Sequence, residues 1–193
     1  MPSKKKPTSQ EETLAQKLKI KVGKVKPLVL RPEILLCENI PGPMQGLAPR
    51  VIFGKKWWDK TRKEAYRSTL YHCAACGVYK GEAKFRPWLE GHELYHIDYR
   101  RGRMIYLETV PLCHCCHNYI HSGRLKILLT QGKISHKKYT EIIKHGDTIL
   151  FSIGLRRPRP YSGPRPTHSK WRLVINDQEY PPISDRPSRR KFH

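Results

Sequence analysis

The chain has 193 residues, of which 38 are Lys or Arg and 16 are Asp or Glu, and its formal net charge is +22. This length suits one ordinary domain with tails, or two small domains, and excludes a large multidomain enzyme. No apolar run approaches the roughly 18 residues of a membrane span, and the charged N-terminal residues lack the apolar region of a secretory signal. We therefore expect an intracellular protein, cytoplasmic or nucleoid-associated, with no membrane partner. Its excess positive charge points to a polyanion, and nucleic acid is the first candidate.

The N-terminal quarter of the chain has little apolar periodicity. Residues 1–26 carry eight lysines and two glutamates, which predicts a basic flexible arm. Residues 27–56 alternate short apolar runs with Pro, Gly and Asn, which is typical of an irregular segment that wraps a core formed elsewhere.

The central part of the chain reads as a helix, a hairpin and a second helix. An amphipathic helix is predicted over residues 57–70, because Trp58, Tyr66 and Leu70 fall roughly on one side. Residues 92–99 and 104–110 are predicted to be two strands joined by a turn. Another helix is expected to begin at Cys113.

Two further helices and a tail are expected after this block. Gly132 is a natural stop for the first helix, and Ser135 can cap the second, which should end at Gly146. Residues 126–155 are thus a helical extension. Residues 156–193 form a Pro/Arg-rich tail with one short strand, predicted over residues 171–175.

The cysteines give the strongest signal in the sequence. Cys73 and Cys76 form one C-x-x-C knuckle, and Cys113 and Cys116 form another. Two such knuckles complete a tetrahedral four-sulfur site, which is closed and therefore a structural Zn²⁺ site. Without an export signal, a metal is favoured over disulfides. The remaining Cys37 and Cys115 are interpreted as spare thiols.

Two histidines follow the second knuckle at helical spacing. Residues four apart lie on one face of a helix, so His117 and His121 can meet at one divalent ion. The run from Leu112 to His121 resembles the L-C-x-x-C-H-x-x-x-H tail of HNH endonucleases. The stretch from Trp88 to Asp98 resembles the histidine-bearing first strand of that family.

The resemblance covers residues 57–125, which match an HNH nuclease module of the zinc-stapled branch. It implies an α+β fold: a small ββα-metal (HNH) finger with a four-cysteine zinc site, flanking helices and basic extended tails. It also implies a metal-dependent endonuclease that hydrolyses DNA phosphodiester bonds. His117 and His121 would hold a catalytic divalent metal, Mg²⁺, Mn²⁺ or Zn²⁺.

The first strand can be aligned with the family in two registers. In the preferred register, His96 takes the place of the general base and Tyr95 stands where a metal ligand usually lies. In the second register, His92 is the ligand and the following glutamate is the base. The family asparagine corresponds to Glu108, which can accept hydrogen bonds but cannot donate them when ionised. Glu108 is expected to orient an imidazole such as that of His96, unless the site is inactive.

Double-stranded DNA is the expected partner, held largely through its phosphates. The arginines predicted to contact it are Arg100, Arg101, Arg103, Arg124, Arg156, Arg157 and Arg159. The alternative to an endonuclease is a non-catalytic zinc-ribbon protein that binds nucleic acid. A structural component of a ribonucleoprotein explains the basic tails but leaves His96, His117 and His121 without a role.

Overall fold

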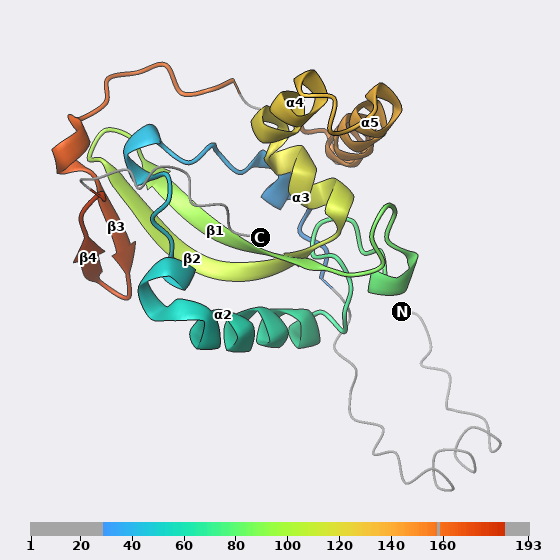
Figure 1. Cartoon of the computed structure of the whole chain (residues 1–193), viewed down its shortest axis with the longest axis horizontal. Coiled ribbons are helices and arrows are strands. Elements are labelled where there is room, and N and C mark those ends of the chain that lie inside the picture. Colours follow the sequence, from blue (N-terminus) through green and yellow to red (C-terminus); the bar gives the residue numbers. More distant parts are fainter. Residues whose placement is uncertain (1–28, 158, 184–193) are drawn as a thin grey trace, which may run out of the picture.

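A computed structural model describes residues 29–157 and 159–183 of the chain (Figure 1). The predicted basic arm at residues 1–26 lies outside them. The described part has an α+β fold with four α-helices and one four-stranded sheet of order β1-β2-β3-β4. In chain order the elements are α2 (Pro49–Ser68), β1 (Glu90–Asp98), β2 (Arg103–Leu112), α3 (His114–Ile120), α4 (Ser122–Thr130), α5 (His136–Ser152), β3 (Arg172–Ile175) and β4 (Gln178–Tyr180).

Strands β1 and β2 form the predicted antiparallel hairpin. Their register runs from Glu90 opposite Leu112 to Asp98 opposite Arg103, and one extra residue of β2, Leu107, makes a bulge. The turn is stabilised by the Asp98 carboxylate, which accepts hydrogen bonds from the backbone amides of Arg100 and Arg101 at 3.0 Å. The hairpin is therefore a firm frame for the side chains near its open end.

The two faces of the hairpin are covered by different helices. Helix α2 lies along one face and α3 along the other, with α4 and α5 beyond α3 (Figure 1). Trp57 contacts the ring of Tyr106 on β2, with ring centroids 6.2 Å apart. Helix α2 begins at Pro49 rather than at residue 57, because proline suits a first helical turn. The helix is interrupted at Gly54, whose φ is 78°. The predicted start of this helix was therefore too late.

The caps of α5 were predicted correctly at one end only. Ser135 caps its N-terminus, and its hydroxyl accepts a hydrogen bond from the amide of Lys138 at 3.2 Å. Gly146 does not end the helix, which continues to Ser152. A Cβ atom on Gly146 would lie 2.2 Å from ring carbons of Tyr119 on α3. This glycine is needed for the close approach of two helices and not for a turn.

The tail contributes to the folded body of the protein. Strand β3 pairs parallel with β2, and β4 pairs antiparallel with β3, so the tail contains two strands and not one. Trp171 and Leu173 are fully buried beside Met104 of β2 in a second hydrophobic cluster. No helix in the described part of the chain is long and apolar enough to cross a membrane.

Candidate metal centres

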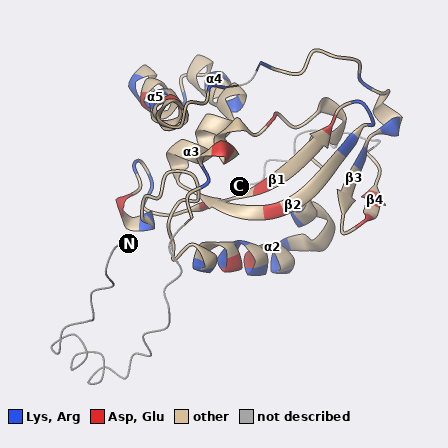
Figure 2. Ribbon diagram, turned by 180° about the vertical axis from the view of Figure 1, so that it is seen from behind, with Lys and Arg blue, Asp and Glu red and all other residues tan. Residues whose placement is uncertain are grey.

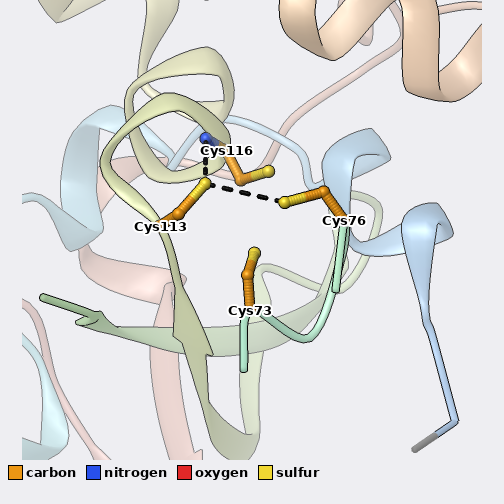
Figure 3. Close-up of side chains that lie close together, drawn as sticks. All are labelled: Cys73, Cys76, Cys113 and Cys116. Atoms are coloured by element: carbon orange, nitrogen blue, oxygen red, sulfur yellow. Dashed lines mark hydrogen bonds between the residues drawn. The ribbon is translucent and has the colours of Figure 1, made fainter. Parts of the chain in front are cut away.

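The four predicted cysteines converge between the loop before β1 and the start of α3 (Figure 3). Their sulfur atoms all lie within 4.8 Å of one another, and those of Cys76 and Cys113 are 3.8 Å apart. A tetrahedral zinc with Zn–S bonds of about 2.3 Å needs sulfurs about 3.8 Å apart, whereas a disulfide needs about 2.05 Å. The donor set and its spacing therefore fit Zn²⁺.

Local backbone geometry builds this cysteine group. Gly77, at φ 76°, closes the first knuckle, and its amide donates to the carbonyl of Cys73 at 2.9 Å. Cys113 caps α3, because its sulfur accepts from the amide of Cys116 at 3.5 Å. Hydrogen bonds from its cysteine neighbours, Cys113 first, hold the pKa of Cys73 well below its ordinary value. The same network raises the pKa values of Cys113 and Cys116, so one thiolate, at Cys73, is favoured when no metal is bound.

The two other cysteines do not join the group. Burial raises the pKa of Cys37 to about 11 and that of Cys115 to about 12. Both are neutral thiols near pH 7, as expected of spare cysteines.

A second group, of three histidines, lies next to the first along α3. His92 on β1 meets His117 and His121 at the end of α3, with one ligand nitrogen of each within 4.8 Å of the others. The ring centroids are 4.8 to 5.4 Å apart. The helix supplies two imidazoles one turn apart and the strand supplies the third. Three imidazoles suit a divalent transition metal with room for a further ligand.

Burial keeps two of these imidazoles neutral. It lowers the pKa of His92 to about 2 and that of His121 to about 4, with the charge of His117 as a second cause. A neutral imidazole is the form that ligates a metal. The histidine group is therefore ready for a cation near pH 7.

A carboxylate that sequence reasoning missed orients the histidine group. Glu90 accepts hydrogen bonds from Nδ1 of His117 at 2.5 Å and from Nδ1 of His114 at 2.7 Å. Burial raises the pKa of Glu90, but these two hydrogen bonds outweigh it and leave the pKa well below its ordinary value. The contact leaves Nε2 of His117 for a metal, the usual arrangement of a carboxylate behind a ligand. His114 is buried.

The first-strand residue in this group is His92 and not His96, the residue favoured by the preferred register. His96 is exposed and does not belong to the group. Four residues of strand separate the two histidines by about 13 Å, so only one of them can reach an ion at the end of α3. Tyr95 does not belong to the group either, and packs near Tyr106 with ring centroids 6.1 Å apart. His92, the ligand in the second register, is therefore the first-strand histidine that lies with His117 and His121.

Glu108 does not orient an imidazole. Its carboxylate accepts a hydrogen bond from Arg31 at 2.7 Å. Glu90 takes the orienting position that was expected for Glu108. The signal was present in the sequence, because Glu90 and His92 are two residues apart and share one face of a strand.

A buried acid, Glu93, follows His92 on β1 and pairs with α2. The side chain of Glu93 is 6% exposed, and its carboxylate accepts a hydrogen bond from Arg50 of α2 at 2.5 Å. Burial raises the pKa of Glu93, and the charge of Arg50 partly offsets this. A cavity of about 20 Å³ is bordered by Glu93, His92 and His121. A cavity of this size has room for about one water molecule.

The predicted DNA-contacting arginines differ in their surroundings. Arg103 pairs with Glu179, and Arg101 approaches Asp98 at 3.5 Å. Arg157 donates to the carbonyl oxygen of Tyr119 and lies 4.2 Å from the centre of its ring, so it holds the tail against α3. All seven are exposed, and the remaining four form no ion pair within the described residues: Arg100, Arg124, Arg156 and Arg159.

The chain matches no family model, no curated protein and no solved structure. The argument for function therefore depends on the two groups themselves. One is a set of four thiols that fits structural zinc, and the other is a set of three imidazoles, one of which is hydrogen-bonded to Glu90. Both can hold a metal ion.

Proposed function

We propose that the chain is a metal-dependent endonuclease of the HNH type that hydrolyses phosphodiester bonds of DNA. The observation that carries the proposal is the convergence of His92, His117 and His121 from a hairpin and the helix that follows it. A divalent ion bound there would neutralise charge on a phosphate and lower the pKa of a water molecule. The net charge of +22 supports a nucleic acid as the substrate.

In this proposal the chain's own residues have separate tasks. The three histidines hold the ion, and Glu90 fixes the orientation of His117. Glu93 is the candidate general base, as in the second register, because the residue lines the water-sized cavity together with His92 and His121. Its raised pKa brings it nearer to the working pH, which favours proton transfer. Arg50 holds this carboxylate in place.

The test is nicking of a supercoiled plasmid with added Mg²⁺ or Mn²⁺. We expect His92→Ala and His117→Ala to lose at least about a hundredfold in rate, the scale on which a metal-bound nucleophile contributes. His96→Ala is the matched control and should keep activity within a few fold, because His96 is exposed outside the group. Zinc content and circular dichroism establish that each variant is folded. Nicking by His92→Ala at the wild-type rate would disprove the proposal.

A second candidate is a zinc-stabilised nucleic-acid-binding protein without catalysis. The enclosure of the histidine group favours it, because the adjoining cavity of about 20 Å³ is walled by residues 37–40 as well as by β1 and α3. His92 is buried and His117 and His121 are only partly exposed, which limits the access of a phosphodiester to them. DNA binding with no nicking under either metal would establish this candidate.

A further inference from the structure

Helix α2 carries a row of four basic side chains. Lys56, Lys60, Lys63 and Arg67 are spaced by four, three and four residues, which places them on one face of the helix. All four are exposed. The row, called here the α2 basic row, spans about 16 Å at 1.5 Å per residue.

The α2 basic row keeps its charge free. Across residues 29–157 and 159–183, no carboxylate lies within salt-bridge distance of any of the four side chains. Asp59, the nearest acid toward the sheet side, pairs with Arg62 at 2.7 Å. Glu64 borders the row without such a pair. A net of at least three positive charges therefore remains for a partner.

The row faces away from the histidine group. The opposite side of α2 packs on the hairpin. Trp58 and Arg62 lie so close to Gly91 of β1 that a Cβ atom added to this glycine would be within 3.3 Å of both side chains. The histidines belong to the other face of the hairpin, toward α3, and Figure 1 shows α2 and α3 on opposite sides of it. Basic residues on α2 are marked in Figure 2. A contact at the row is thus separate from any contact at the histidines.

We propose that the α2 basic row binds the phosphate backbone of nucleic acid, as a second contact surface remote from the histidine group. The row contributes affinity without sequence preference, since Lys and Arg side chains neutralise phosphates irrespective of the bases. The even row of charges matches a linear polyanion. No large apolar side chain is exposed between Lys56 and Arg67. The exposed Phe53 lies before the break at Gly54, and the exposed Leu70 lies after the end of the helix. An apolar face for a bilayer or a protein partner is therefore missing there.

The experiment measures binding of a fluorescent 24-base-pair duplex to the full chain, without added divalent metal, from 50 to 200 mM KCl. The test variant replaces all four residues of the α2 basic row by glutamine. The control variant makes the same replacement at four exposed lysines of α4, α5 and the loop between them: Lys126, Lys133, Lys137 and Lys144. Both variants lose four charges, and glutamine keeps a good helix propensity.

For four phosphate contacts, the slope of log Kobs against log [K⁺] should become less negative by about 3.6 in the test variant. The control variant should change it by less than about 1. Equal changes in the two variants would overturn the proposal, because the effect would then come from net charge alone. An unchanged duplex slope together with lost binding to phosphatidylserine vesicles would also overturn it and assign the row to a membrane surface. The result is independent of nicking activity, so it fails or succeeds separately from the proposed hydrolysis.

Discussion

Replacing Gly146 by alanine should destabilise the protein through the contact between α5 and α3. A methyl group there would meet two ring carbons of Tyr119 at 2.2 Å and a third at 2.5 Å, well inside van der Waals contact. The ring cannot move aside easily, because it is fully buried and its hydroxyl donates to Asp147 at 2.6 Å. Arg157 covers the ring at 4.2 Å. Overpacking of this kind costs about 1–3 kcal/mol, whereas alanine in a helix interior gains at most about 1 kcal/mol.

We therefore expect Gly146→Ala to lower the free energy of unfolding by about 1–2 kcal/mol net, measured by urea denaturation of the zinc-loaded protein. Gly123→Ala in α4 is the matched control, because a Cβ at Gly123 meets no atom within 4 Å. That variant should be neutral or slightly more stable. A Gly146→Ala protein as stable as the control would show that the two helices are not in close contact at this point.

Three further predictions concern the metal groups. Cys76→Ser should release zinc and unfold the module, since structural zinc supplies folding energy directly, and unchanged zinc content with an unchanged melting curve would contradict this. Glu90→Gln should weaken Mn²⁺ or Co²⁺ binding at the histidine group by about 10–100-fold while the zinc content stays the same; a titration with unaltered affinity would show that the carboxylate does not support His117. The pKa of His92 is about 2 in the folded protein and about 6.5 in the unfolded chain, so below pH 6.5 only the unfolded state takes up the proton. With zinc at the cysteines and no ion at the histidine group, His92 should therefore contribute a loss of about 1.6 kcal/mol of stability between pH 6.5 and 5, and His92→Gln should remove this contribution whereas His96→Gln should not.

Features set by local chemistry were predictable from the sequence. Cysteine spacing is read directly as knuckles, and the four sulfurs do converge. The alternating pattern of the hairpin and the turn after Asp98 predicted the ends of both strands to within two residues. The Ser135 cap depends only on the next three residues, so it was also found.

Features that depend on contacts between distant elements were not predictable in this way. The choice between His92 and His96 depends on how far along β1 the end of α3 lies, which no local pattern records. In the sequence, Gly146 resembles the glycine that ends a helix. The need for glycine at this position comes from the Tyr119 ring on another helix. Strand β4 has three residues and forms by pairing with β3. The role of Glu90 likewise follows from the position of α3.

Helix α3 has seven residues, and it joins the two centres through consecutive residues, Cys116 and His117. A helix this short is unstable by itself in water. Zn²⁺ bound by the cysteines would therefore also hold His117 in place for an ion of its own. An oxidant that removed such a Zn²⁺ from the thiols would thus weaken metal binding at the histidines without reacting with any of them.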